Sequence, residues 1–376
     1  MERKPQKICL VSFFVHEAFF IPLSQLREII LKISPESNSI ITVSPELADK
    51  MIFDFKKDVV IIHKNKRHFV FRIINYFILN LKISWSILIK SKDVDSYLFF
   101  NETGLLLPMI IAKLRNKQTI WVLPSSHTKM IEHHRDFLNS ISIYLQSLSF
   151  HIVDKIVLYS PRLISEWNLE KYRNKILISH NHYINNEKFK VTTCFSDRPF
   201  LIGYIGRLSA EKGVQNFVRA LPAILNDTKG LRVLIGGDGH LKNSIQSVLQ
   251  EEKLTDYVDL PGWVSNENYP KYLNQLRLLV LSSYTEGLPY TILEAMTCGT
   301  PVLATPVGAI PDIIIDGKTG FIMEDNLPEC IAENVSRAMR SPNLDKIAEN
   351  GRRFVEENFT FEKTTENWNR ILNKLE

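Results

Sequence analysis

The sequence predicts an α/β protein built from two Rossmann-like domains that face a cleft, with a C-terminal helix that crosses back to the first domain. Short apolar runs alternate with stretches of helical spacing along most of the chain. Residues 278–304 contain a complete strand–helix–strand unit, which favours a crossover between parallel strands. A length of 376 residues, 45% of them hydrophobic, suffices for two packed cores. We expect a first domain at 1–190, a second at 191–359 and the crossing helix at 360–376.

In the first half, apolar runs bounded by turn residues predict strands at 7–14, 40–43, 59–62, 97–100, 119–123 and 152–159, and residues 175–179 lead into the link between the halves. A helix at 21–33 follows the first of them, because Leu23, Leu26 and Ile30 recur at helical spacing, and Ser34-Pro35 ends it. Further helices are expected at 105–114 and from residue 161. The βαβ rhythm is typical of a parallel sheet.

The second half repeats this rhythm. Strands are predicted at 200–205, 231–235, 258–260, 278–281 and 302–304, and helices through residues 217–225 and at 269–276, 292–296 and 361–375. Glycine-containing loops follow several of these strands at their carboxyl ends, where open α/β sheets bind their ligands.

Two glutamates follow the apolar run at 278–281. Glu286 lies in the loop after this strand, and Glu294 lies in the next helix, flanked by apolar residues. A carboxylate at the edge of a core needs hydrogen-bond donors, which the hydroxyls of a sugar could supply, and we expect the amides of residues 290–292 to be unpaired donors at the helix start. The alternative is a carboxylate that only stabilises the helix dipole. The setting predicts a site for a diphosphate with several hydroxyls.

Two segments carry a resemblance to a known family. EGLPYTILEAMTCGTPVLAT, residues 286–305, resembles the E-x7-E segment of retaining family 4 glycosyltransferases, and GRLSAEKG, residues 206–213, resembles their G-R-x-x-x-x-K-G segment. The resemblance covers about residues 200–359. It implies the GT-B fold and transfer of a sugar, with retention, from a nucleotide-diphosphate sugar to a glycan, lipid-linked or other hydroxyl acceptor.

The resemblance also implies roles for single residues in donor binding. Arg207 and Lys212 would neutralise the diphosphate, Glu294 would hold the ribose and Val264 would contact the base. Glu286 would orient the donor sugar. The remaining residues expected to line the donor site are Gly206, Gly287, Leu288 and Pro289.

His127 follows the strand predicted at 119–123, and similar enzymes have a histidine there that contacts the donor sugar near the reacting carbon. His133 and His134 lie nearby as rivals for this role. On the acceptor side the chain departs from the family pattern, since relatives commonly have a glycine-rich loop after the first strand and residues 12–23 contain no glycine.

Neither a cofactor nor a metal ion is expected. His180 and His182 have the spacing of a chelating pair, but no acidic or cysteine ligand lies near them in the sequence. Two other functions remain open on these residues: a nucleotide-sugar epimerase of similar fold, which needs no acceptor, and a non-catalytic protein that binds nucleotide sugars.

The charge is unevenly distributed. Residues 1–190 contain 27 Lys and Arg against 17 Asp and Glu, whereas residues 191–376 contain 19 against 24. This indicates either an anionic partner for the first half or ordinary solubility charge. Four scattered cysteines favour a reducing compartment, so we expect a cytoplasmic protein. Nucleic acid is not expected as a partner.

Residues 64–92 combine aromatic, aliphatic and basic residues, and Arg72 and Lys82 interrupt the apolar run too early for a membrane-spanning helix. The stretch predicts either an amphipathic helix on an anionic membrane surface or a helix packed on the core with solvated ends. A peripheral position on the cytoplasmic membrane face is the first of these alternatives.

Overall fold

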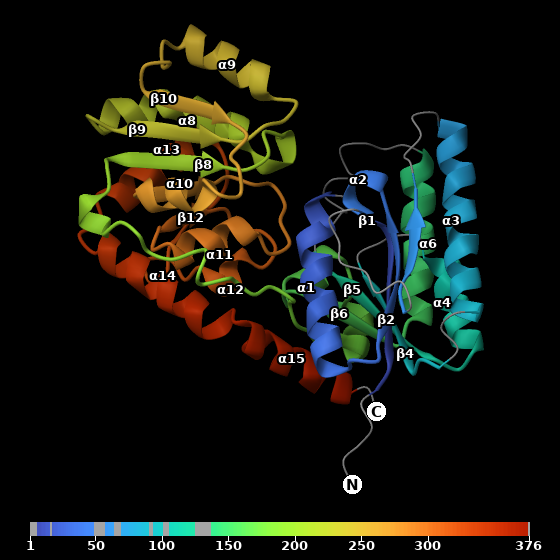
Figure 1. Cartoon of the computed structure of the whole chain (residues 1–376). Coiled ribbons are helices and arrows are strands. Elements are labelled where there is room, and N and C mark those ends of the chain that lie inside the picture. The colour runs from blue at the N-terminus through green and yellow to red at the C-terminus, as the bar shows by residue number, and fades with distance from the viewer. Residues whose placement is uncertain are drawn as a thin grey trace. The chain divides into compact units, whose positions relative to one another are not determined.

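The computed structural model describes residues 6–15, 17–48, 57–63, 69–89, 93–100, 105–124 and 137–374. The chain forms two compact units (Figure 1). The first consists of Met1–His182 together with Phe361–Glu376, and the second is Tyr183–Thr360. Each unit has its own parallel sheet.

In the first unit, the described residues form a sheet of seven parallel strands in the order β3-β2-β1-β4-β5-β6-β7. The strand order changes direction between β1 and β4, and Val11 of β1 lies opposite Ile40 of β2 on one side and Phe99 of β4 on the other. The strands are β1 (Ile8–Val15), β2 (Asn38–Val43), β3 (Val59–Ile62), β4 (Ser96–Phe100), β5 (Gln118–Leu123), β6 (Lys155–Leu158) and β7 (Ile176–Ile178).

The helices of this unit are α1 (Glu17–Ile33), α2 (Pro45–Ala48), α3 (Phe69–Ile89), α4 (Leu106–Leu114), α6 (Phe137–Ile152), α7 (Leu163–Glu166), a 3-10 turn at Glu170–Lys175 and α15 (Phe361–Asn373). The last helix, α15, packs on α1. Its fully buried Trp368 donates a hydrogen bond from Nε1 to the carbonyl of His180 at 2.9 Å. The crossing of the C-terminal helix to the first domain is therefore confirmed.

One predicted boundary was wrong. Ile152 ends α6 instead of starting a strand, and β6 begins only at Lys155. The apolar run that begins at Ile152 continues across the turn at Val153-Asp154, so hydrophobicity alone did not separate the helix from the strand.

Two carboxylates, the buried Asp58 and the partly exposed Asp154, fasten the amino ends of the strands in this unit. Asp58 precedes β3, accepts hydrogen bonds from the Ser39 amide (2.9 Å) and hydroxyl (2.6 Å) at the start of β2, and pairs with Arg27 of α1. Asp154 precedes β6 and accepts hydrogen bonds from the amide and hydroxyl of Thr119 in β5, both at 2.9 Å. Each carboxylate thus joins two neighbouring parallel strands.

In the second unit, six parallel strands have the order β10-β9-β8-β11-β12-β13 within the part of the chain that the structure describes. They are β8 (Leu201–Ile205), β9 (Arg232–Gly236), β10 (Val258–Gly262), β11 (Leu278–Leu281), β12 (Val302–Ala304) and β13 (Phe321–Ile322). Every residue of β8, β11 and β12 is buried, as is typical of strands covered on both faces.

The helices of the second unit are α8 (Val214–Asp227), α9 (Lys242–Glu251), α10 (Tyr269–Gln275), α11 (Tyr290–Thr297), α12 (Ile310–Ile313), α13 (Pro328–Met339) and α14 (Leu344–Asn358), with 3-10 turns at Phe195–Asp197 and Ala210–Lys212. Helix α13 packs on α8, and α14 packs on α11. Phe217 of α8 and Val280 of β11 are fully buried in one apolar core. The two Rossmann-like sheets expected from the sequence are confirmed.

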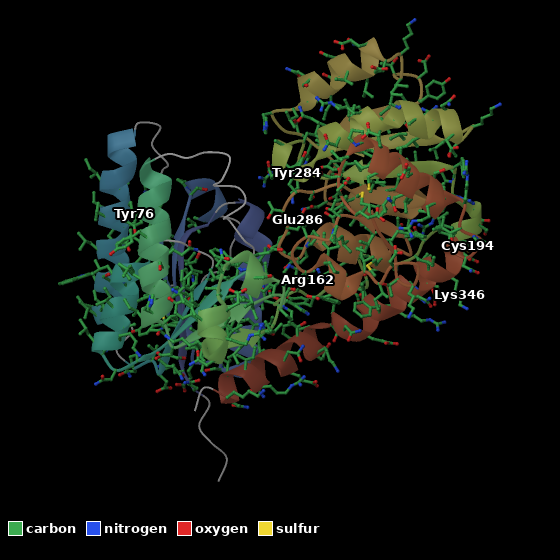
Figure 2. All side chains as sticks on the ribbon, turned by 180° about the vertical axis from the view of Figure 1, so that it is seen from behind. Tyr76, Arg162, Cys194, Tyr284, Glu286 and Lys346 are labelled. Carbon is green, nitrogen blue, oxygen red and sulfur yellow. The ribbon has the colours of Figure 1, made fainter. Side chains whose placement is uncertain are left out.

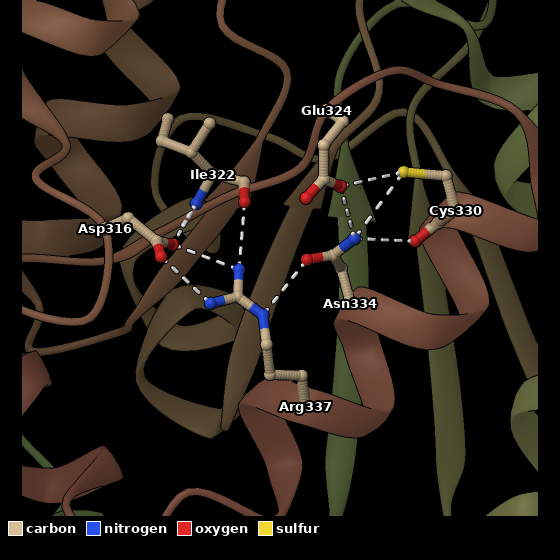
Figure 3. A network of polar contacts seen from close by, with 6 residues as sticks. All are labelled: Asp316, Ile322, Glu324, Cys330, Asn334 and Arg337. Carbon is tan, nitrogen blue, oxygen red and sulfur yellow. Dashed lines mark hydrogen bonds and ion pairs between the residues drawn. The ribbon is translucent and has the colours of Figure 1, made fainter.

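A surface network fastens β13 to α13 (Figure 3). The guanidinium of Arg337 donates to both carboxylate oxygens of Asp316, each at 3.0 Å, and to the carbonyl of Ile322 at 2.9 Å. One turn earlier, the amide of Asn334 donates to Glu324 at 3.2 Å.

Candidate active site

A lysine and a glutamate lie together at the carboxyl end of the second sheet. Lys212 ends the 3-10 turn after β8, and Glu286 lies in the loop after β11 (Figure 2). Their Nζ and Oε1 atoms are 2.7 Å apart, and the Ser283 hydroxyl donates to the same Oε1 at 2.7 Å. Because β8 and β11 are adjacent parallel strands, residues 74 positions apart meet at this edge.

The Lys212 ammonium of this pair can bind a further, anionic ligand. The Glu286 side chain is only 7% exposed, whereas that of Lys212 is 28% exposed, so the ammonium side of the pair is accessible to solvent. An ammonium has three N–H donors, and the bond to Glu286 uses one of them. An anion that reaches Lys212 from solvent can therefore accept a further hydrogen bond from it.

Arg207 lies on the same loop, and its side chain is about half exposed. The Tyr204 hydroxyl donates to the Arg207 carbonyl at 2.8 Å and fixes the backbone there. The Arg207 guanidinium lies 3.6 Å from Oε1 of Glu211. The same oxygen accepts a hydrogen bond from the Ser209 hydroxyl at 2.6 Å. Burial alone would raise the pKa of Glu211, but the bond from Ser209 and the charge of Arg207 outweigh it and keep this pKa below its ordinary value. Glu211 is thus a charged partner that holds Arg207 at the strand end.

Two glycines let the loops approach each other closely. Gly213 has a φ of +64°, and a Cβ there would lie 1.9 Å from the Ser282 carbonyl oxygen at the end of β11. Gly237 has a φ of +142°, and a Cβ there would lie 1.9 Å from the carbonyl oxygen of Gly206. Side chains at either position would push these loops apart, so the glycines set the shape of the site.

The segment after Glu286 is fixed by its backbone. The Gly287 carbonyl accepts a hydrogen bond from the Ala309 amide at 2.8 Å, Leu288 is buried, and Pro289 precedes α11. The Ile292 amide donates to the Pro289 carbonyl at 3.1 Å. The expectation of an unpaired amide at Ile292 was therefore wrong, because the first turn of the helix uses that donor itself.

Glu294 has a different environment from Glu286. It lies in the middle of α11, where it accepts a hydrogen bond from the Tyr269 hydroxyl of α10. Burial raises its pKa to about 7, although the charge of Lys188 and the bond from Tyr269 both act to lower it. The hydrogen-bond donor that Glu294 needs is therefore Tyr269, which no local sequence pattern indicated.

Val264 and His127 complete the set of predicted residues. Val264 follows β10 and packs on Gly236 at the end of β9, since its Cγ2 lies 2.9 Å from where a Cβ on Gly236 would be. His127 lies outside the described residues, as do His133 and His134. Among the residues that the structure does describe, no group of three His, Cys, Asp or Glu has the geometry to hold a metal ion.

Several residues that support the site were not predicted. Ser283 binds Glu286, and its place at the end of an apolar run three residues before the glutamate was a signal that could have identified it. Asn216 of α8 donates to the Tyr284 hydroxyl at 2.9 Å and to the Asn326 carbonyl at 2.8 Å, tying the loop after β11 to its neighbours. The two contacts of Asn216 join segments that are distant in the sequence, so only the folded structure shows them.

Comparison with known proteins gives this site a context. The family described as Glycosyl transferases group 1 matches residues 185–354. An uncharacterized glycosyltransferase of Methanocaldococcus jannaschii is 28% identical over 293 residues, which cover 74% of this chain and 73% of that protein. Alpha-D-kanosaminyltransferase of Streptomyces kanamyceticus is 32% identical over 155 residues, covering 41% of this chain and 40% of that one.

Among solved structures, that of Anabaena Alr3699/HepE in complex with UDP matches with a TM-score of 0.78 at 15% sequence identity. The match covers 98% of this chain and 100% of that chain. At this identity the likeness concerns the fold alone, and it confirms the expected GT-B architecture of two Rossmann-like units.

Proposed function

We propose that this chain, a glycosyltransferase whose residues 185–354 form a Glycosyl transferases group 1 domain, transfers a sugar with retention from a nucleotide-diphosphate sugar to a hydroxyl acceptor. The observation that carries the proposal is the pairing of Lys212 with the buried Glu286, with Arg207 on the same loop as Lys212. In this assignment the second unit binds the donor and the first unit binds the acceptor.

The donor diphosphate would be held by the cations of the loop after β8. The guanidinium of Arg207 offers a planar fork that suits phosphate oxygens, whereas Lys212 acts as a compact charge. Lys212 is already oriented by Glu286, so little reorganisation accompanies binding. Glu294 would accept hydrogen bonds from the ribose, and Val264 would contact the base.

The proposed reaction proceeds on one face of the donor sugar. The bond between the anomeric carbon and the diphosphate oxygen breaks, and its electron pair leaves with the diphosphate. A bond forms between the acceptor oxygen and the anomeric carbon on the same face, and the acceptor proton passes to an oxygen of the departing phosphate. Arg207 and Lys212 stabilise the charge that develops there, without a metal ion or a protein nucleophile.

Glu286 would orient the hydroxyls of the transferred sugar. One of its oxygens accepts hydrogen bonds from Lys212 and Ser283, which fixes the carboxylate relative to the phosphate site. The role of His127, which lies outside the described residues, is proposed from the family resemblance alone: contact with the donor sugar near the reacting carbon.

The acceptor is proposed to be a glycan, lipid-linked or other hydroxyl compound in polysaccharide or glycoconjugate biosynthesis. A lipid-linked acceptor would place the enzyme at the cytoplasmic face of a membrane, and this peripheral location is part of the proposal. The structure contains no helix, among the residues it describes, that is both long and apolar enough to cross a bilayer.

The phosphate assignment can be tested by isothermal titration with UDP and a panel of other nucleoside diphosphates. Arg207→Ala and Lys212→Ala should each weaken binding by about 1.5–3 kcal/mol, because each removes one charge-assisted hydrogen bond. Arg232→Ala is the matched control, since this arginine is also exposed and pairs with Asp259 at 3.1 Å. Unchanged affinity in both test variants would remove the proposed phosphate site.

His127 can be tested by turnover. His127→Ala should slow transfer while leaving the affinity for the nucleoside diphosphate unchanged, because its contact is with the sugar and forms when donor is enclosed. Wild-type turnover in this variant would exclude His127 as the reacting-centre histidine, and the same assay on His133→Ala and His134→Ala would then examine its rivals.

A further inference from the structure

Helix α3 of the first unit exposes a continuous apolar face. We call it the α3 face; its seven residues are 42–65% exposed and comprise Ile74, Phe77, Ile78, Leu81, Trp85, Leu88 and Ile89. Their spacing is i, i+3, i+4, i+7, i+11, i+14 and i+15, which confines them to an arc of about 120° at 100° per residue. Tyr76 marks the helix in Figure 2.

The orientation of this helix is unusual for a surface helix. Asn80, Ser84 and Ser86 are at most 9% exposed, so small polar residues lie on the inner side, together with Ile83 and other apolar residues. Helix α3 packs on α4 through that inner side. A helix that only covers a core places apolar residues inward and polar residues outward. Here water contacts the large apolar side chains instead, which marks an interaction surface.

The residues in and next to α3 in the sequence carry charge of one sign. Between Val59 and Lys92 the sequence contains no Asp or Glu, and its seven Lys and Arg are Lys64, Lys66, Arg67, Arg72, Lys82, Lys90 and Lys92. Lys82 belongs to α3 and is exposed. Five of the seven lie outside the described residues, immediately before and after the helix, and therefore flank it in the chain.

We propose that the α3 face docks on the surface of an anionic lipid bilayer. With 21 residues the helix is about 30 Å long, and its apolar arc suits burial at the boundary between headgroups and acyl chains with the helix axis parallel to the membrane. The flanking cations would contact anionic headgroups, and Lys82 can extend its charged end to them from the side of the arc. Trp85, 65% exposed, is the side chain that favours this interfacial depth most.

Charge complementarity selects this occupant over a second copy of the chain. A symmetric contact of two α3 faces would bring the basic ends of both copies close together, where like charges repel. An anionic bilayer neutralises those same cations while it buries the apolar arc. Docking through the α3 face extends the proposed peripheral membrane location. It rests on the proposed function only in assuming that a bound enzyme would face a lipid-linked acceptor.

The test uses the full chain in flotation experiments with vesicles of phosphatidylglycerol mixed with phosphatidylcholine, and with phosphatidylcholine alone. The double variant Leu81→Glu/Trp85→Glu replaces two residues that are 60% and 65% exposed. Its matched control is Leu327→Glu/Tyr257→Glu in the second unit, where the two residues are 56% and 51% exposed. Both variants should remain folded, because the replaced side chains are surface-exposed and glutamate is a good helix former.

Wild-type protein and the control should bind the anionic vesicles at least tenfold more strongly than the neutral ones, and raising NaCl from about 0.05 M to about 0.5 M should weaken the binding. The α3 double variant should lose at least about tenfold in partitioning. Equal loss in the control, equal binding to both vesicle types, or wild-type binding by the α3 variant would each overturn the proposal.

Size-exclusion chromatography of the same proteins tests the competing occupant. A dimer that the α3 double variant converts to a monomer, with no vesicle binding by the wild type, would overturn the membrane proposal and identify a second copy as the partner. UDP titration of the α3 variant tests the proposed donor site independently of the proposed membrane surface. Donor binding should be unchanged, so a failed membrane test leaves the donor site intact and a failed donor site leaves the membrane test valid.

Discussion

The two units place carboxylates at opposite ends of their sheets. In the first unit, Asp58 and Asp154 precede strands and bind the starts of neighbouring strands. In the second unit, Glu286 follows a strand and binds Lys212, which follows the adjacent strand. Ligands of open parallel sheets bind at the carboxyl ends of the strands. The same residue type therefore stabilises the fold at one end of a sheet and is available to a ligand at the other.

The comparison predicts different consequences of mutation. A carboxylate at the amino end that satisfies several protein donors should affect the free energy of unfolding when it is removed. A carboxylate at the carboxyl end, beside a partly exposed cation, should affect binding or turnover instead.

The largest effect is expected for Asp58→Ala. It should lower the free energy of unfolding by about 3–5 kcal/mol, because it removes the buried carboxylate that pairs with Arg27, whose side chain is 15% exposed, and that accepts hydrogen bonds from the Ser39 hydroxyl and amide. Urea denaturation measures the loss. Asp259→Ala, which removes a carboxylate 55% exposed, is the control and should change stability by less than about 1 kcal/mol.

Measuring UDP affinity in Asp58→Ala distinguishes an effect on stability from an effect on function. Under conditions where Asp58→Ala is folded, its affinity for UDP should equal that of the wild type, since Asp58 lies at the amino end of the other unit's sheet. A selective loss of UDP affinity would contradict the proposed division of roles between the two sheet ends.

The next largest effect is expected for Glu286→Gln. The glutamine keeps the shape of the side chain but loses the charge that pairs with Lys212, so turnover should fall about a hundredfold, in line with the loss of one preorganised polar group. UDP affinity should change less, and thermal unfolding should show a fold of similar stability. Ser283→Ala is the companion variant, because it removes one donor from the same carboxylate without touching the ligand. Wild-type turnover in Glu286→Gln would refute the sugar-orienting role.

The contrast between Glu286 and Glu294 was only partly accessible from the sequence. Their positions at a strand end and in the following helix could be predicted, because the apolar run at 278–281 and the helical spacing after it are local patterns. Their partners could not: Lys212 lies 74 positions from Glu286, and Tyr269 lies on another helix. Such pairs depend on strand order and helix packing, which no local pattern encodes.

The α3 region shows the complementary limit. A helix rich in apolar residues could be predicted here, but not whether those residues face the core or the solvent, because apolar residues occur all round the helix. Burial in the fold decides the point: Ile83 is fully buried and Trp85, two residues later, is 65% exposed. The strands of both sheets were easier to predict, because a strand buried on both faces is a short, continuous apolar run.

Glu294 should show opposite effects on stability and on binding. Its pKa rises from the ordinary 4.5 to about 7 in the folded protein, so the folded state holds a proton that the unfolded state has lost between these values. Stability contributed by this group is therefore complete below about pH 4.5 and is lost as pH rises to about 7. Glu294→Gln cannot ionise and still accepts a bond from Tyr269, so at pH 8 it should be more stable than wild type by about 1–3 kcal/mol.

Denaturation of wild type and Glu294→Gln from pH 4 to pH 8 measures this difference, and titration with UDP at pH 8 measures binding. The variant should gain stability and lose UDP affinity, which is the signature of a residue kept for its ligand. Equal slopes of stability against pH in the two proteins would show that the pKa of Glu294 is the same in the folded and unfolded states, and would contradict the raised pKa. Wild-type affinity for UDP would remove Glu294 from the ribose site.

The smallest effect is expected for Arg337, whose well-made contacts lie on the surface of the second unit (Figure 3). Its guanidinium binds both oxygens of Asp316, yet the two side chains are 43% and 49% exposed, so solvent screens the attraction. The bond to the Ile322 carbonyl adds a contact that ties α13 to β13. Arg337→Ala should therefore lower the free energy of unfolding by only about 1 kcal/mol, and part of that loss should disappear at high salt. Urea denaturation at low and high NaCl measures both quantities. A loss as large as that of Asp58→Ala would show that the number of hydrogen bonds, and not burial, determines how much a charged side chain stabilises this fold.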